Sequence, residues 1–338
     1  MKRIVTFGEI LLRFSKSGGL RLGQGYEWEG HFGGSEANVA VSLSVLGNKV
    51  GYVTRLPDND IGRACLHELR RNGIDVSDIV WGGERLGSYF FEGSRGIRGS
   101  KVVYDRKGSS FYASAPGMFP WKDIFSRADV FHCSGITCAV SQSATDATFE
   151  AVKAAKAAGI GITCDINYRK NLWKYEGADA SRTLPELMQY SDFIFGDQDE
   201  WAVATGVPKI PMDHMQADTV LDMEAYGRYF DMMHRKFPAC GEMMLGLRNQ
   251  MASDHHTLTA LLWYHGTVYH TKIWDVDVLD PVGVGDAFVA GYIHAREKWP
   301  GDPRLCLDFS LGAATLKNSI EGDFNLSTEE EILDFIAI

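Results

Sequence analysis

The sequence predicts an α/β protein in which helices cover both faces of a mostly parallel sheet, beside a small β lid. Short β-branched segments alternate with helical segments over most of the 338 residues. Two other segments, at about 13–32 and 87–112, interrupt this alternation with glycine and aromatic residues. Parallel strands need a crossover connection, usually a helix, and the regular spacing supplies one. We therefore expect a single domain over residues 1–338, with the lid strands contributed by the two interrupting segments.

Hydrophobic patterning predicts the first elements. Residues 4–7 and 50–54 are short apolar runs typical of buried strands, and residues 38–46 between them predict a helix. Residues 61–72 predict a second helix, which Gly73 ends because glycine readily adopts the left-handed conformation after a helix. The order of strand, helix and strand makes one β-α-β unit.

The middle of the chain repeats this pattern. Apolar, β-branched segments at 130–132 and 160–164 flank an alanine-rich stretch, 144–158, that predicts a helix. Residues 207–240 hold prolines around a helical pattern, so we expect a surface excursion whose Met and Tyr side chains serve packing. The same order of strand, helix and strand is expected at 193–195, 200–205 and 243–247.

The lid segments have a different period. Residues 13–32 and 87–112 alternate every second residue and show no helical period. Such a pattern predicts antiparallel strands in a small separate sheet rather than strands of the parallel core.

Composition excludes several classes of protein. Hydrophobic residues make up 45% of the chain and charged residues 23%, which is typical of a folded protein. The net charge of −10 argues against a nucleic-acid binder, whose surface would be basic. No apolar stretch approaches the ~20 residues that span a bilayer. We expect a cytoplasmic protein with neither a nucleic-acid nor a membrane partner.

The cysteines and histidines carry no disulfide or metal signature. The six cysteines are scattered without a C-x-x-C pair. His67-Glu68 fails the H-E-x-x-H pattern because Arg71 stands in the last position. We expect reduced, buried thiols and no structural metal.

A glycine-rich segment near the C-terminus is the strongest local signal. Gly283 and Gly285 let the backbone approach a ligand, and residues 287–296 after them predict a helix. The free N–H groups at the start of that helix favour an anion such as phosphate. Asp286 would repel a phosphate, so its presence is better explained if it accepts a proton from a hydroxyl that attacks phosphorus.

Alternative roles for this glycine-rich segment account for fewer of its residues. Asp286 as a helix N-cap would explain the aspartate but not the two glycines before it. The chain has no G-x-x-x-x-G-K-[ST] motif and no strand-linked G-x-G-x-x-G motif, so P-loop and dinucleotide sites are excluded.

These residues resemble the ribokinase-like (PfkB) carbohydrate kinases. The family signature D-T-x-G-A-G-D-x-F-x-x-G is matched from Asp280 to Gly291, with Pro281 and Val284 as departures. An N-terminal signature, a Gly-Gly turn followed by x-x-A-N-x-A, is matched by residues 33–40, and residues 55–62 resemble the family's G-x-D-x-x-G region. The resemblance implies a three-layer sandwich with a mostly parallel central sheet and a small β lid.

Within the family, the motifs are most similar to those of kinases that act on 2-keto-3-deoxygluconate. The matching segments are 32–38, 87–92, 103–106 and 165–173. The resemblance implies that Asp286 is the base and that the backbone of Gly283, Val284 and Gly285 stabilises the transferred group. The residues that it implies for the sugar are Gly33, Gly34, Asn38, Tyr89, Tyr104, Arg106, Arg169 and Asp323.

The residue types support an acidic substrate independently. On a strand, Tyr104 and Arg106 share one face, and arginine pairs a carboxylate in bidentate fashion. The competing interpretation is that Arg106 and Arg169 are surface residues paired with neighbours such as Asp105 and Asp165.

The nucleotide side departs from the family pattern. The N-x-x-E motif, which orients Mg²⁺ in the family, appears as residues 197–200, with Glu200 matched and Asp197 replacing Asn. We expect a turn at 246–249, at a position where the family binds ATP. Residues 247–256 depart from the family's usual nucleotide loop. For ATP the resemblance implies Asn167, Asp197, Gly246, Arg248 and Asn318, and for Mg²⁺ it implies Glu200.

The resemblance therefore implies transfer of a phosphoryl group from ATP to the 6-hydroxyl of 2-keto-3-deoxy-D-gluconate. Two alternatives remain: a fructokinase- or ribokinase-like activity on a neutral sugar, and a non-catalytic sugar-acid sensor. Family members often pair through the lid, so Tyr26, Trp28 and Phe32 either contact a second copy or cover the sugar pocket.

Overall fold

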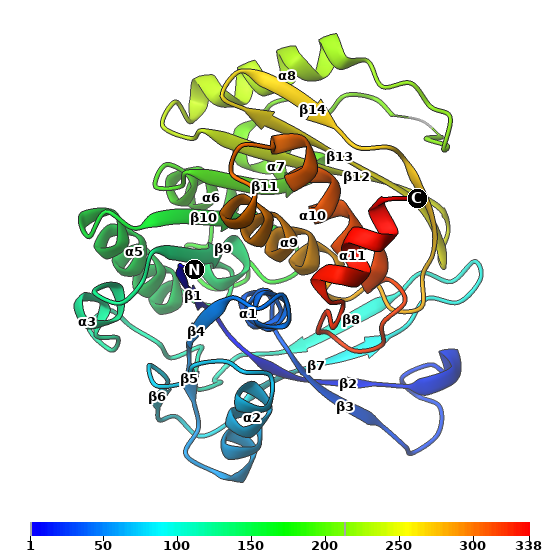
Figure 1. Ribbon diagram of the computed structural model, residues 1–338. Coiled ribbons are helices and arrows are strands. Elements are labelled where there is room, and N and C mark those ends of the chain that lie inside the picture. The colour runs from blue at the N-terminus through cyan, green and yellow to red at the C-terminus, as the bar shows by residue number, and fades with distance from the viewer. Residues whose placement is uncertain (1, 213) are drawn as a thin grey trace.

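A long, mostly parallel sheet forms the centre of the molecule in the computed structural model, which describes residues 2–212 and 214–338 (Figure 1). Its strands are β1 (Arg3–Phe7), β4 (Lys49–Val53), β9 (Val130–Ser134), β10 (Gly161–Asp165), β11 (Phe193–Asp197), β12 (Glu242–Ala252), β13 (His255–Tyr264), β14 (Thr267–His270) and β15 (Trp274–Asp277). The order is β14-β13-β12-β11-β10-β9-β1-β4, and β15 pairs with β13. The strands from β4 to β12 pair in parallel, and β13 to β15 add an antiparallel edge.

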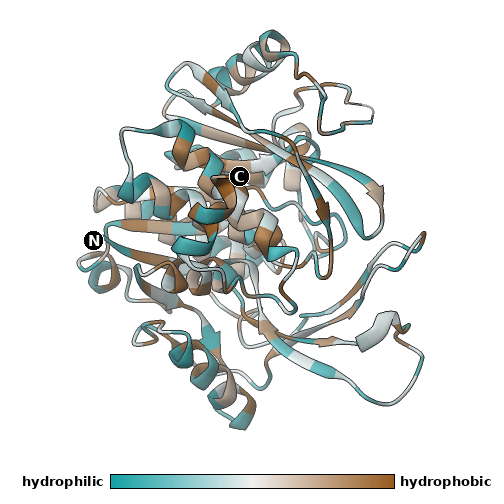
Figure 2. Ribbon diagram, turned by 45° about the vertical axis from the view of Figure 1, so that its right-hand side comes forward, coloured by the Kyte–Doolittle hydropathy of each residue, from teal (hydrophilic) through white to brown (hydrophobic). Residues whose placement is uncertain are grey.

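Helices cover both faces of this sheet, as expected. One face carries α1 (Ser35–Val45), α2 (Asp60–Arg71), α9 (Val284–Lys298), α10 (Pro303–Lys317) and α11 (Glu329–Ile336). The other carries α3 (Trp121–Phe125), α4 (Gly135–Cys138), α5 (Gln142–Ala157), α6 (Ala180–Met188), α7 (Gln198–Thr205) and α8 (Met223–Lys236). Neighbouring strand residues serve opposite cores, since Ile4 packs in one and Val5 in the other. Hydrophobic residues are prominent along the central strands (Figure 2).

The lid is a second, four-stranded sheet with the strands β2 (Leu11–Ser15), β3 (Glu29–Gly33), β7 (Gly87–Glu92) and β8 (Lys101–Asp105). Its order is β3-β2-β7-β8. The pairs β2–β3 and β7–β8 are antiparallel, but β2 and β7 are parallel, so the expectation of a wholly antiparallel subsheet is wrong. Because residues 34–86 separate β3 from β7 and include two helices, the chain returns to the lid in the same direction as β2.

Helix and strand positions follow the sequence expectations with shifted ends. The helix α1 begins at Ser35 and α9 begins at Val284, each three residues before the expected start. The expected turn at 246–249 is wrong, because these residues lie inside β12 and pair with residues 257–260 of β13. The two strands share a long ladder there, and their connection comes only after Ala252.

The proline-flanked excursion contributes to the core. Its helix α8 buries Tyr226, Tyr229, Phe230 and Met233 against the sheet, as their expected packing role requires. All six cysteines are buried and unpaired. Within residues 2–212 and 214–338, no helix combines the length and apolar character needed to cross a bilayer.

Candidate active site

A cavity of about 500 Å³ lies between the lid sheet and the C-terminal ends of the parallel strands. Asp165 ends β10 and Asp197 ends β11, and both line it. Ligands of open α/β sheets bind outside the carboxyl ends of the strands, so this is the position that the fold class favours. The remaining walls come from the lid, the start of α1, the strands β12 and β13, and the segment 281–289.

The glycine-rich segment forms a turn at the start of α9. Gly283 is the N-cap of this helix with a φ of 81°, a conformation that side chains rarely adopt. A Cβ at Gly283 would also collide with the carbonyl oxygen of Asp323, so glycine is required twice over. In the described part of the chain, the N–H groups of residues 284–286 donate to no protein acceptor. These amides and the helix dipole therefore make an anion site beside the cavity.

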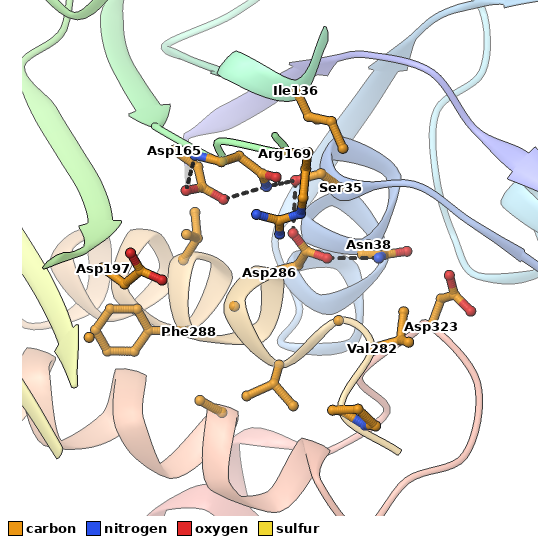
Figure 3. A pocket seen from close by; sticks show the side chains of 18 of the residues that line it. Ser35, Asn38, Ile136, Asp165, Arg169, Asp197, Val282, Asp286, Phe288 and Asp323 are labelled. Carbon is orange, nitrogen blue, oxygen red and sulfur yellow. Dashed lines mark hydrogen bonds between the residues drawn. The ribbon is translucent and has the colours of Figure 1, made fainter. Parts of the chain in front are cut away.

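Asp286 lies in the first turn of α9, at the centre of the cavity (Figure 3). Ser35 Oγ donates to its Oδ1 at 2.8 Å, and Asn38 Nδ2 donates to its Oδ2 at 2.8 Å. Burial raises the pKa of the Asp286 carboxyl above its usual value, and the two hydrogen bonds partly offset that effect. Since Gly283 occupies the N-cap position, the interpretation of Asp286 as a helix cap is wrong.

The N-terminal Gly-Gly turn sets the position of these two partners of Asp286. Gly34 is the N-cap of α1, and a Cβ there would collide with the carbonyl oxygen of Glu9. Gly34 N donates to Asn38 Oδ1 at 3.1 Å, which orients the amide so that its Nδ2 faces Asp286. Asn38 therefore has both amide atoms engaged, the oxygen by Gly34 and the nitrogen by Asp286, and it also lines the cavity.

The lid side of the cavity carries Tyr89, Tyr104 and Arg106. The guanidinium of Arg106 is 6% exposed, and its Nε donates to Glu9 Oε2 at 2.6 Å. Ser109 donates to the other oxygen of Glu9. Among the described residues, Arg106 Nη1 is buried without a hydrogen-bond partner. Because Nε is the only donor of this guanidinium with a protein acceptor in the part of the chain that the structure describes, the side chain keeps further N–H groups for an acceptor on a ligand in the cavity.

Asp323 lines the same side, where it accepts hydrogen bonds from Tyr89 and from Arg13 Nη1, the latter at 3.1 Å. Gly33 does not line the cavity but lies directly beside Asp323, because a Cβ there would collide with the Asp323 carboxylate. Sequence reasoning missed Arg13. Arg13 lies between Leu12 and Phe14 in β2 and, unlike them, is buried.

Arg169 and Asn167 follow β10. Arg169 is 44% exposed, and its Nη1 donates to Glu200 Oε1 at 3.1 Å, so it pairs with neither Asp165 nor a lid residue. Asn167 has a φ of 43°, an uncommon conformation for a residue with a side chain. Its Nδ2 donates to Ser35 Oγ at 2.9 Å, and the same hydroxyl donates to Asp286, so Ser35 connects Asn167 to Asp286.

Asp165 and Glu200 form an acidic region next to Asp286. Burial and the charge of Asp286 raise the pKa of Asp165 to about 7. Burial and the charge of Asp165 raise the pKa of Glu200 to about 8. Asp197 caps α7 through a reciprocal capping box with Glu200. A nearby cation would lower both raised pKa values, because opposite charge favours the ionised carboxylate.

This donor set fits Mg²⁺ in one way only. Over the residues that the structure describes, no group of three or more His, Cys, Asp or Glu side chains could hold a metal by itself. Mg²⁺ is commonly bound by one or two carboxylates together with water and substrate phosphates. Glu200 and Asp165 meet that lesser requirement.

The nucleotide-side residues are only partly brought together. Asn167, Asp197, Gly246 and Arg248 line the cavity, whereas Asn318 does not. The Asn318 amide donates to the Ala314 carbonyl at 2.9 Å, inside α10. Sequence reasoning also missed the apolar wall on this side, for which no local motif exists; it consists of Phe195, Leu258, Phe288, Val289, Leu311 and Ala314.

Comparisons with known proteins show which family this chain is similar to. Residues 1–227 match the family model described as pfkB family carbohydrate kinase. The chain is 29% identical over 332 residues to a 2-dehydro-3-deoxygalactonokinase from Haloferax volcanii, which covers 97% of this chain and 95% of that protein.

Solved structures of the same fold are also similar. The crystal structure of 2-dehydro-3-deoxygluconokinase from Thermotoga maritima has a TM-score of 0.92 and 30% identity, with 100% of each chain covered. A protein from E. coli that carries the name Ribokinase II was crystallised with ATP and Mg²⁺. It is 20% identical with a TM-score of 0.79, covers 100% of this chain and 99% of its own, and supports the fold alone.

Proposed function

The chain belongs to the PfkB family of carbohydrate kinases, and from this premise we propose that it phosphorylates 2-keto-3-deoxy-D-gluconate at the 6-hydroxyl. ATP is the proposed donor, and 2-keto-3-deoxy-6-phosphogluconate is the proposed product. The observation that carries the sugar-acid substrate is the Arg106 guanidinium, which lines the same cavity as Asp286 and, among the described residues, donates through Nε alone. Residues 1–338 would form one kinase domain, with the lid belonging to the sugar side.

Asp286 is the proposed base. Its carboxylate accepts one hydrogen bond on each oxygen, so about two of its roughly four lone-pair sites stay available for the proton of the 6-hydroxyl. The raised pKa makes it a stronger base than an exposed aspartate. As the hydroxyl oxygen approaches phosphorus, the proton passes to Asp286 and the γ-phosphoryl group leaves ADP.

The glycine-rich segment 280–286, which we call the anion loop, is the proposed stabiliser of the transferred group. Charge in phosphoryl transfer spreads over the phosphoryl oxygens, and fixed N–H donors stabilise it without reorganising. The amides of Val284, Gly285 and Asp286 follow Gly283 at the start of α9 and can serve this purpose. The side chain of Val284 is not required for it, so the departure from alanine leaves the donors intact.

The carboxylate of the sugar acid is the proposed partner of Arg106, with Tyr89 and Tyr104 beside it. Glu9 holds the guanidinium through Nε, and the Nη groups have no protein acceptor among the described residues, which leaves donors of this side chain for the ligand. A neutral sugar would offer only hydroxyl groups to this cation. Arg169 and Asp323 are the proposed contacts for the rest of the sugar, and Gly33, Gly34 and Asn38 shape the wall.

Mg²⁺ is proposed with ATP, held by Glu200 and Asp165 through water or phosphate. When bound, it neutralises charge on the phosphate oxygens. The nucleotide would lie along Gly246, Arg248 and the apolar wall, while Asn167 and Asp197 line the phosphate end. Asn318 would act indirectly, because its backbone oxygen accepts from Leu279 N at 2.8 Å, just before the anion loop.

A coupled assay of ADP formation with a panel of sugars and sugar acids tests the substrate. We expect 2-keto-3-deoxy-D-gluconate to give the highest kcat/KM, with its galactonate epimer as the comparison. Higher kcat/KM for fructose or ribose would overturn the sugar-acid assignment. Thermal stabilisation by the acid without ADP formation would support the sensor alternative instead.

A homodimer through the outer face of the lid is also proposed. Tyr26 is 100% exposed and Trp28 41% exposed, and Trp28 packs on Phe14 and Phe90. Tyr26, Trp28 and Phe32 are absent from the residues lining the cavity, so the alternative that they cover the sugar has no support. Light scattering should give twice the chain mass, and Trp28→Glu should give a monomer.

The cytoplasm is the proposed location because it supplies ATP, which cell fractionation would test.

A further inference from the structure

Arg13 is a buried cation on the lid that the proposed chemistry does not use. It lies in the middle of β2, paired in register with Tyr89 of β7, and is 3% exposed. Its guanidinium lies 4.4 Å from the centre of the Phe91 ring. Burying a charge is costly unless it is paired, so the partners of Arg13 define what it holds in place.

The first partner belongs to the anion loop. Arg13 Nη2 lies 2.8 Å from Asp280 Oδ2. Asp280 Oδ1 accepts from Val282 N at 3.0 Å, and its Oδ2 also accepts from Gly322 N at 3.0 Å. Asp280 therefore joins the backbone at Val282, just before Gly283, to the segment at Gly322, and Arg13 holds Asp280 from the lid.

The second partner belongs to the sugar side of the cavity. Arg13 Nη1 lies 3.1 Å from Asp323 Oδ2, and Tyr89 donates to the other oxygen of Asp323. Both Tyr89 and Asp323 line the cavity. A second buried cation, Lys317, donates to the Ile320 carbonyl at 2.8 Å and balances the two carboxylates without bridging them.

We propose that Arg13 is a positioning residue that couples sugar binding under the lid to the conformation of the anion loop. This inference rests on the proposed function, since it assumes a sugar under the lid and a phosphate at the loop. A ligand that contacts Asp323 or Tyr89 moves the guanidinium, and the same guanidinium holds Asp280. The planar fork of arginine bridges both carboxylates at once, which a lysine ammonium cannot do with the same geometry.

The coupling is measurable as reciprocal binding. If Arg13 connects the two sides, the bound sugar should raise the affinity for the nucleotide, and the bound nucleotide should raise the affinity for the sugar by the same factor. Typical coupling factors are about 5- to 150-fold. An ion pair that only stabilises the fold would lower the Tm on substitution without changing this factor. The readout therefore separates the two roles.

The test compares Arg13→Lys with Arg85→Lys by isothermal titration of the sugar acid with and without Mg²⁺ and a non-hydrolysable ATP analogue. Arg85 is the matched control because it pairs with Asp105 at 2.7 Å near the lid but does not line the cavity. We expect Arg13→Lys to lower the coupling factor to about 2 or less and to lower kcat about tenfold. The affinity for the sugar alone should change less. Arg85→Lys should keep the wild-type values.

Wild-type coupling and kcat in Arg13→Lys, or a loss of Tm alone, would overturn the proposal. If Arg13→Lys does not fold, Asp280→Asn tests the same bridge from the loop side and should show the same loss of coupling. The sugar panel, measured on the wild-type enzyme, tests the proposed substrate separately from the role of Arg13. If another sugar of the panel is the better substrate, the titration uses that sugar and decides the role of Arg13 all the same.

Discussion

The sugar side and the nucleotide side of the cavity are built differently. On the sugar side, two arginines are buried and paired: Arg106 with Glu9, and Arg13 with Asp280 and Asp323. On the nucleotide side, Arg248 is exposed and the wall is apolar. Figure 3 shows Asp286 between them, with Asp197 and Phe288 on one side and Val282 and Asp323 on the other.

The difference indicates where specificity resides. A buried donor that lacks a partner discriminates strongly, because the wrong ligand leaves it unpaired. An apolar wall with exposed charges binds by contact area and discriminates less. We therefore expect changes on the sugar side to alter substrate choice and changes on the nucleotide side to alter KM for ATP modestly.

The largest effect should come from the residue that the two sides share. Asp286→Asn keeps the volume and can keep one acceptor, but it cannot take the proton of the hydroxyl. We expect kcat to fall by about 10²- to 10⁴-fold, with both KM values changed little. Steady-state kinetics measure this, and Asp146→Asn on the exposed side of α5 is the control. Near wild-type turnover in Asp286→Asn would remove the assigned base.

A smaller but selective effect is expected at Arg106. Arg106→Lys should lower kcat/KM for the sugar acid by about 100-fold, which corresponds to about 3 kcal/mol for a charged hydrogen bond. Any slow turnover of a neutral sugar should fall much less. Arg63→Lys, an exposed ion pair on α2, is the matched control. Equal losses for acid and neutral sugar would contradict recognition of the carboxylate.

On the nucleotide side, Arg248→Ala should raise KM for ATP by about two- to fivefold, because an exposed charge contributes about 0.2–1 kcal/mol. The KM for the sugar should not change. A large effect on the sugar instead would erase the distinction between the two sides.

The smallest expected effect is on stability. The pKa values of Asp165 and Glu200 are raised in the folded protein, to about 7 and about 8, so folding favours their protonated forms. That stability is present at low pH and is lost as the pH rises through these values. We expect the Tm of the ligand-free protein to fall by a few degrees between pH 5 and pH 8, because the unfolded carboxyls are already ionised there while the folded ones still hold their protons. Burial also raises the pKa of Glu36, to about 7, in the same direction.

Glu200→Gln isolates one contribution, because it removes a titrating group without removing the cap position at Asp197. Its Tm should change less with pH over the same interval. If the slope is the same as in the wild type, Glu200 is already ionised in the folded protein throughout this interval, and its pKa is not raised.

The local sequence predicted the anion loop well and the nucleotide side of the cavity poorly. The two glycines and Asp286 lie within four residues, so the turn at Gly283 and the start of α9 are local structures. The turn expected at 246–249 failed because pairing with β13, not local propensity, decides that backbone.

The sequence by itself determined the alternation of strands and helices, the turn at Gly283 and the residue types that a sugar-acid kinase needs. These depend on periodicity and on the conformations open to each residue, which neighbours in the chain decide. Tertiary structure alone decided that Ser35 and Asn38 hold Asp286, that Arg106 keeps a free donor beside Glu9, and that Arg13 points inward. Those contacts join segments up to 310 residues apart, and no local pattern specifies which buried charges will meet.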